Sequence, residues 1–276
     1  MTFVAAENSR GVYRRSAKAP CIFCHRKNVP FSEEHLPPES IVGKCGYLLV
    51  DWVCTRCNNR LSVEDKYFGT HYHGSLARAL YGITGKKSKG AEVALKDFRG
   101  KFQQKINTVQ LQIRTTKKKY APLSEPAALD KREATTIEAN KRAINTRRLG
   151  RCLAKMAIET LACVKPEIVF SSALDDVRNY ALGRKTKLKF LPFALGVSKG
   201  RYGTGLYLPE STARVNAPVA LIWIPASIYA VQLFKFDDLL PLRTVAESME
   251  LIVDETGKRT ENLTLNINLE FPATPL

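Results

Sequence analysis

The sequence predicts an α+β protein in which a small metal-clamped module precedes a larger domain of mixed helices and strands. Two Cys-x-x-Cys pairs occur within the first 60 residues. Apolar residues recur at helical spacing around residues 149–161, and beyond about residue 187 short apolar runs alternate with turn residues. The expected parts are a flexible basic arm (1–20), the metal-clamped module (21–80), a linker (81–90) and an α+β domain with a basic surface (91–276).

The chain is strongly basic. Its 276 residues include 43 Lys and Arg against 26 Asp and Glu, which gives a formal net charge of +17 and a pI near 9.7. This balance favours polyanionic partners, and nucleic acid is the first candidate. No run of about 18 apolar residues predicts a membrane span, and the first residues lack the apolar stretch of a signal peptide. We therefore expect a nucleic-acid partner, no membrane association and a cytoplasmic location.

The two cysteine pairs predict a structural zinc site. Two residues between the cysteines of each pair let both thiolates turn toward one tetrahedral ion, and two such pairs supply four ligands. In a reducing compartment, paired cysteines at this spacing favour metal binding over disulfides. The expected zinc ligands are Cys21, Cys24, Cys54 and Cys57.

Other polar residues with chemical potential lie between the cysteine pairs and directly after them. In chain order they are Glu34-His35, Pro37, Gly43 and Asn58. This order resembles the zinc-containing members of the HNH endonuclease family. Their signature is a C-x-x-C pair, an acidic residue plus His, a Pro-containing turn with Gly, and a second C-x-x-C pair followed by His or Asn. The resemblance covers about residues 20–70 and implies a ββα-metal module, in which a hairpin packs on one helix.

The resemblance also implies roles for individual residues. His35 matches the general base, while Glu34 and Asn58 match ligands of one catalytic Mg²⁺ or Mn²⁺ ion. The middle Asn of the signature is missing from residues 47–53, where Asp51 is the polar candidate for orienting the base. A backbone carbonyl is the alternative for that orienting role. These residue types suit phosphodiester hydrolysis, because a neutral imidazole serves as a base near pH 7 and an oxygen-ligated divalent ion neutralises developing charge.

Structural explanations for the same residues remain open. Asn58 can cap the helix that begins after the second cysteine pair, which is a common role for Asn. Glu64 and Asp65 follow at helical spacing and are expected on a solvated helix face.

The excess positive charge is concentrated in the middle of the chain. Residues 78–151 hold 19 Lys and Arg against 6 Asp and Glu. Few aromatic residues interrupt this stretch, so it suits phosphate contacts better than base stacking. The candidate nucleic-acid contacts are Lys117, Lys118, Lys119, Arg147 and Arg148.

The remaining elements follow from periodicity and stop signals. The absence of Pro and the apolar spacing predict a helix between about 130 and 164 that ends at Lys165-Pro166. A shorter helix is expected at 175–182, with Gly183 after its end. Expected strands lie at 91–102, 108–115, 189–197, 217–225, 228–236, 249–254 and 263–271.

Together these patterns favour a metal-dependent endonuclease that cuts DNA, double-stranded DNA first. The second domain would then grip DNA, target the enzyme or regulate it, and family habit suggests bacterial defence or a mobile element. Another function class is a non-catalytic zinc-ribbon protein that binds nucleic acid, with His35 and Asn58 as structural residues. A further alternative joins a nuclease module to a domain that senses a small ligand or a protein partner.

Overall fold

The computed structural model shows a mixed α+β fold, as the sequence predicts. It describes residues 2–7, 11–16, 18–43, 46–70, 78, 83, 92–94, 99–105, 108–114, 120–122, 145–196, 203–208, 217–224 and 227–254. The chain divides into two compact units: Met1–Phe68 with Ile144–Arg259, and Gly69–Ala143 with Thr260–Leu276. These boundaries differ from the expected module (21–80) and domain (91–276), because residues from both expected parts build the first unit.

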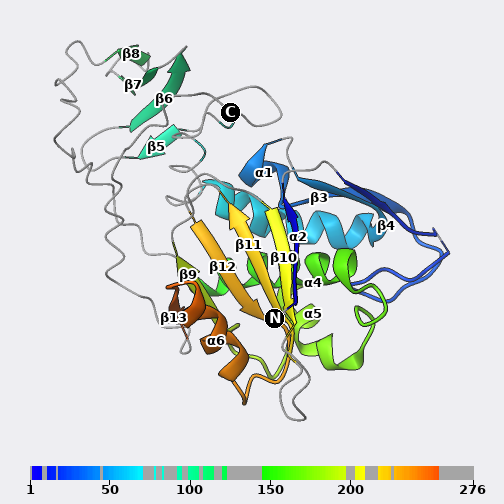
Figure 1. The fold of residues 1–276 in the computed structure, drawn as a ribbon. Helices are drawn as coiled ribbons and strands as arrows, with labels where there is room; N and C mark the ends of the chain where they lie inside the picture. Colours follow the sequence, from blue (N-terminus) through cyan, green and yellow to red (C-terminus); the bar gives the residue numbers. More distant parts are fainter. Residues whose placement is uncertain are drawn as a thin grey trace. The chain divides into compact units, whose positions relative to one another are not determined.

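A three-stranded sheet and a helix form the cysteine-bearing part of the first unit. Strand β4 lies in the centre of the sheet, antiparallel to β3 and parallel to β2. Helix α2 follows β4 directly, and the short helix α1 lies in the connection between β3 and β4. The bounds are Val12–Arg14 (β2), Phe31–Leu36 (β3), Glu39–Val42 (α1), Tyr47–Cys54 (β4) and Thr55–Thr70 (α2). The order β3, β4, α2 is that of a ββα unit (Figure 1).

A six-stranded antiparallel sheet forms the other half of the first unit. Its strand order is β1-β10-β11-β12-β9-β13. Four strands correspond to runs predicted from apolar patterning, with β12 beginning one residue before its run: β9 (Phe193–Gly196), β11 (Val219–Ile224), β12 (Ser227–Gln232) and β13 (Ile252–Asp254). The sheet also contains β1 (Thr2–Glu7) and β10 (Gly203–Leu208), which patterning did not predict.

The N-terminal segment is where the sequence-based expectation fails most clearly. A flexible arm was expected over residues 1–20, but Thr2–Glu7 pairs with Gly203–Leu208 and Val12–Arg14 pairs with β4. Both segments gain backbone hydrogen-bond partners by joining a sheet at its edge. The partner strand for Thr2–Glu7 lies about 200 residues away in sequence, so local composition could not reveal the pairing.

Helix α4 (Thr146–Val164) connects the cysteine-bearing part to the large sheet. The Asn145 side chain caps its start by accepting a hydrogen bond from the Arg148 amide at 3.1 Å, and the helix ends before Lys165 as predicted. Most of its residues from Leu149 onward are buried. The helix contacts β10, β11 and β12 and also β3, so one continuous apolar core joins both halves of the unit (Figure 1).

Shorter helices complete the first unit. The 3₁₀ helix η1 (Ser172–Leu174) leads into α5 (Asp175–Ala181), which packs on α4. Gly183 follows the end of α5 with φ +63°, the left-handed conformation expected of a glycine there. Helix α6 (Leu240–Ser248) packs against the sheet through a separate apolar cluster that includes Leu242, Val245 and Ala230.

The second unit contains an antiparallel sheet with strand order β5-β6-β7-β8. Its strands are β5 (Glu92–Ala94), β6 (Arg99–Lys105), β7 (Thr108–Arg114) and β8 (Tyr120–Pro122). The strand predicted at 108–115 corresponds to β7. The run 91–102 was predicted as one strand, which is wrong, because it contains β5 and the start of β6, two strands that pair antiparallel with each other. The first part of the predicted helix, 130–144, and the predicted strand 263–271 lie outside the described residues.

Candidate functional site

The four predicted zinc ligands come together. Cys21 and Cys24 lie in the loop before β3, Cys54 ends β4 and Cys57 lies in the first turn of α2. Their Sγ atoms all lie within 4.8 Å of one another, and three of the four residues are buried. Within the described part of the chain, this is the one group of three or more His, Cys, Asp or Glu residues close enough to hold an ion.

Hydrogen bonds polarise the thiols of this cluster. The Cys57 thiol donates to Cys21, and the Cys54 amide donates to the same Sγ at 3.4 Å, so these bonds lower the pKa of Cys21 to about 4. The same contact raises the pKa of Cys57, which is the donor. Four cysteine sulfurs this close together suit a zinc ion, because the bound ion displaces the thiol protons. The cluster can therefore hold a metal such as zinc.

The rest of the unit fixes the loop that carries Cys21 and Cys24. The guanidinium of Arg178, on α5, donates to the carbonyl oxygen of Ile22 at 2.9 Å and also to the Ser171 and Val169 carbonyls. Arg178 is 2% exposed. The Ile22 amide donates to the Trp52 carbonyl of β4 at 3.1 Å. The loop is thus bound both to the hairpin and to a helix more than 150 residues away in sequence.

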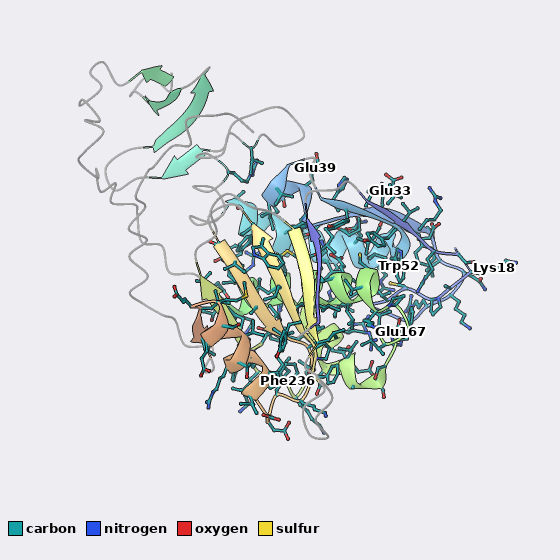
Figure 2. All side chains as sticks on the ribbon, in the orientation of Figure 1. Lys18, Glu33, Glu39, Trp52, Glu167 and Phe236 are labelled. Carbon is teal, nitrogen blue, oxygen red and sulfur yellow. The ribbon has the colours of Figure 1, made fainter. Side chains whose placement is uncertain are left out.

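His35 lies on the outer side of the hairpin. Side chains alternate across a strand, and in β3 Glu34 and Leu36 are buried while His35 is half-buried. His35 pairs with Leu48 of β4. Glu33, two positions before His35, is exposed at the surface of the hairpin (Figure 2). The imidazole is therefore accessible, and its side of the strand is opposite to that of Glu34.

Glu34 is not placed as a ligand of an ion beside His35. Its Oε1 accepts a hydrogen bond from Lys155 Nζ at 2.8 Å, and the same ammonium donates to Asp65 at 2.5 Å. The Glu159 carboxylate lies 3.9 Å from Lys155 Nζ. The catalytic Mg²⁺ or Mn²⁺ expected from the resemblance thus does not fit the position of Glu34, because a protein cation already neutralises that carboxylate. The physical reason is the inward orientation that strand alternation gives to Glu34.

The cluster around Lys155 is deeply buried and rich in negative charge. Burial alone would lower the pKa of Lys155, but Asp65, Glu159 and Glu34 raise it well above its ordinary value. Burial raises the pKa of Glu159 and of Asp65. Asp65 is 5% exposed, so its expected place on a solvated face of α2 is wrong. Both oxygens of Glu159 and Oε2 of Glu34 are buried without a hydrogen-bond partner in the structure.

Asn58 binds the hairpin from the first turn of α2. Its Nδ2 donates to Ser32 Oγ at 2.9 Å and to the Glu33 carbonyl at 3.4 Å. The side chain is thus aimed across the start of the helix at the first half of β3. This contact ties the helix to the strand that carries His35.

Asp51 lies at an irregularity in the hairpin. Register shifts between Ser32 and Glu34, which pair with Val53 and Leu49, so three residues of β4 lie opposite one residue of β3. Asp51 is in the middle of those three, with φ +67°. His35 pairs with Leu48, three positions away, and no hydrogen bond joins Asp51 to His35 among the described residues. The described residues thus show no contact through which Asp51 orients His35, since the irregular pairing places Asp51 away from the position opposite His35.

The predicted nucleic-acid contacts have different outcomes. The guanidinium of Arg148 donates to Glu64 at 2.7 Å and lies 4.0 Å from the ring centre of Tyr67, so it already has protein partners. The guanidinium of Arg151 donates a hydrogen bond to the other carboxylate oxygen of Glu64, with 3.4 Å between the nitrogen and the oxygen. Arg147 is exposed on the first turn of α4. Lys117, Lys118 and Lys119 lie outside the described residues.

A hollow beside the cysteine cluster was not predicted from the sequence; most of the surface that lines it is apolar, and two arginines border it. It has a volume of about 520 Å³ and is bordered by Arg26 and Arg56, one from each cysteine pair's neighbourhood. The signal was present, because a basic residue follows or lies within each pair.

Comparison with known proteins gave no match to a protein-family model, to a curated protein or to a solved structure. In the portion of the chain that the structure describes, no helix has both the length and the apolar character needed to cross a bilayer.

Proposed function

We propose that this protein hydrolyses phosphodiester bonds in nucleic acid, with DNA as the first substrate and His35 as the general base. The observation that carries the proposal is the ββα unit itself. A hairpin and the helix that follows it are held together at one end by four clustered cysteines, His35 is half-exposed on β3, and Asn58 reaches from α2 to the same strand.

The proposed chemistry uses the properties of these groups. A neutral imidazole takes a proton from water near pH 7, and this can accelerate attack on phosphorus by about 10²- to 10⁴-fold. Asn58 holds the start of α2 against β3 and so fixes the strand that presents His35. Zinc bound by the four thiolates is proposed as a structural ion, because four protein ligands leave no open position for water.

The proposal assigns no catalytic ion to named residues, since Glu34 is bound to Lys155. The requirement for Mg²⁺ or Mn²⁺ is measured directly. Zinc-loaded protein is incubated with supercoiled plasmid, single-stranded DNA and RNA, each with Mg²⁺, with Mn²⁺ or with a chelator too weak to remove the zinc. Cleavage only in the presence of an added ion would establish that the reaction requires a divalent cation.

The decisive variant is His35→Ala. We expect cleavage to fall by at least about 100-fold, the lower bound for loss of a general base. His25→Asn is the matched control, because His25 is exposed beside the cysteine cluster and Asn tolerates its φ of +58°. Equal cleavage by His35→Ala and wild-type protein would refute the catalytic assignment.

A non-catalytic zinc-dependent nucleic-acid-binding protein is the second candidate. The pairing of Glu34 with Lys155 favours it, because that contact removes one expected ion ligand. In this case the protein binds nucleic acid with zinc present, and neither Mg²⁺ nor Mn²⁺ produces cleavage of any substrate. The same assay therefore separates the two functions.

A further inference from the structure

The surface beside the cysteine cluster carries an excess of positive charge, larger than the net −2 of a zinc ion bound by four thiolates. Residues 24–30 and 54–60, which flank and include the clamp, contain four basic residues and no Asp or Glu. All four basic residues are exposed: Arg26, Lys27, Arg56 and Arg60. No carboxylate of the described residues forms an ion pair with any of them. This surface therefore differs from Arg148, whose charge Glu64 neutralises.

A hollow in this surface is lined mostly by apolar atoms and has two of the four basic residues at its border. Arg26 and Arg56 border it, Asn59 adds an amide, and Val29 and Pro30 contribute apolar surface. The Thr55 amide donates to the Pro30 carbonyl at 2.9 Å, which fixes the start of α2 against the loop. The hollow is thus bounded by two segments that the cysteines and this hydrogen bond hold in place.

The positions of the arginines on α2 point to an anion. Arg56 and Arg60 are four residues apart, so they lie on one face of the helix, where like charges destabilise the helix unless an anion lies between or beside them. The N-terminal end of α2 adds partial positive charge at the same place. Arginine presents a planar fork that forms paired hydrogen bonds with phosphate oxygens. A phosphate group beside Arg56 would offset its repulsion from Arg60 and accept paired hydrogen bonds from its guanidinium.

We propose that the hollow bordered by Arg26 and Arg56 binds the sugar-phosphate backbone of a nucleic acid. The phosphate lies against the two guanidinium groups, and the sugar packs on Val29 and Pro30. The identity of the polymer rests on the proposed function, whereas the phosphate chemistry rests on the charges of the hollow. The site lies on the cysteine-bearing part of the chain.

The test measures binding and its dependence on salt. Zinc-loaded full-length protein is titrated against fluorescein-labelled duplex DNA, single-stranded DNA and RNA by anisotropy at several salt concentrations. The variants are Arg26→Gln and Arg56→Gln. The control is Lys187→Gln, which removes the same charge from an exposed position between α5 and β9. Zinc content and circular dichroism verify that each variant is folded.

The plot of log K against log salt concentration has a negative slope. Each arginine variant is expected to make this slope shallower by about one unit for duplex DNA, which corresponds to loss of one phosphate contact. Lys187→Gln is expected to keep the wild-type slope. Wild-type slopes in both arginine variants, or no nucleic-acid binding by the wild-type protein, would overturn the proposal. The strand type with the largest effect identifies the polymer.

The outcomes for this site and for catalysis are separable. Protein that binds through Arg26 and Arg56 but does not cut refutes the proposed hydrolysis and leaves the phosphate site standing. Protein that cuts through His35, with unchanged salt slopes in both arginine variants, refutes the phosphate site alone.

Discussion

Replacing Lys155 with Met tests the buried ion cluster that joins α4 to the hairpin and to α2. Met retains an unbranched apolar chain of similar length, so packing changes little. The replacement removes the ammonium that contacts Glu34 at 2.8 Å and Asp65 at 2.5 Å. Lys155 is fully buried, and the two carboxylate side chains are 7% exposed, so water cannot replace it without rearrangement.

The cost follows from the charges that remain. Removing one partner of a buried ion pair destabilises a protein by about 3 to 5 kcal/mol. The variant can instead protonate one of the two carboxylates, which sets an upper limit on the loss of stability. Protonating a carboxyl group of ordinary pKa near 4 at pH 7 costs about 4 kcal/mol. We therefore expect a loss of about 3 to 5 kcal/mol at pH 7. This loss of stability should become smaller as the pH is lowered from 7 to 5. For each extra proton that the folded variant binds relative to folded wild-type protein, the decrease is about 1.4 kcal/mol per pH unit.

Urea unfolding of the zinc-loaded protein at pH 7 and pH 5 measures this difference, with tryptophan fluorescence as the signal. Lys165→Met is the control at the end of the same helix. The Lys165 side chain is 42% exposed and lies 3.9 Å from Glu167, so its replacement should cost less than about 1 kcal/mol. A Lys155→Met protein within 1 kcal/mol of wild type at pH 7 would refute the charge argument.

Other predictions concern the metal, the titration of the cluster and the basic central segment. Cys54→Ser should lose zinc and unfold the cysteine-bearing part, because metal binding and folding are coupled there, whereas Cys163→Ser, outside the cluster, should keep its zinc as measured by atomic absorption. Burial raises the pKa of Glu159, so the folded state keeps a proton that the unfolded state releases above about pH 4.5. Wild-type stability should therefore fall as pH rises from that value through the folded pKa, and Glu159→Gln should lack this contribution; equal pH slopes in urea unfolding would contradict it. Changing the three lysines at 117–119 to Glu should weaken binding to all DNA sequences alike and flatten the salt dependence, and an unchanged slope would show that they make no phosphate contacts.

Features that depend on local spacing could be predicted from the sequence. The C-x-x-C spacing identified the four cysteines, and their Sγ atoms do cluster. Helical periodicity and the Lys165-Pro166 stop located α4, whose start is set by the local cap at Asn145. These features depend on residues close together in the chain, where backbone geometry determines which side chains meet.

Features that depend on distant partners could not be predicted. Glu34 and His35 are adjacent in sequence, yet strand alternation places them on opposite sides of β3. The partner of Glu34 is Lys155, 121 residues away. No local pattern distinguishes a carboxylate that faces a lysine from one that faces an ion. The bulge that displaces Asp51 is likewise a property of how two strands pair.

The central position of α4 limits how the cysteine-bearing part can be transplanted. A fragment that ended at residue 80 would keep all four cysteines and His35, but it would lose Lys155 and the Arg178 that holds the Ile22 carbonyl. Its acids at Glu34 and Asp65 would lose their counterion, and the apolar surface that packs on α4 would be open to water. We therefore expect that the ββα unit of this chain does not fold on its own. Any chimaera that borrows it must also carry α4 and α5.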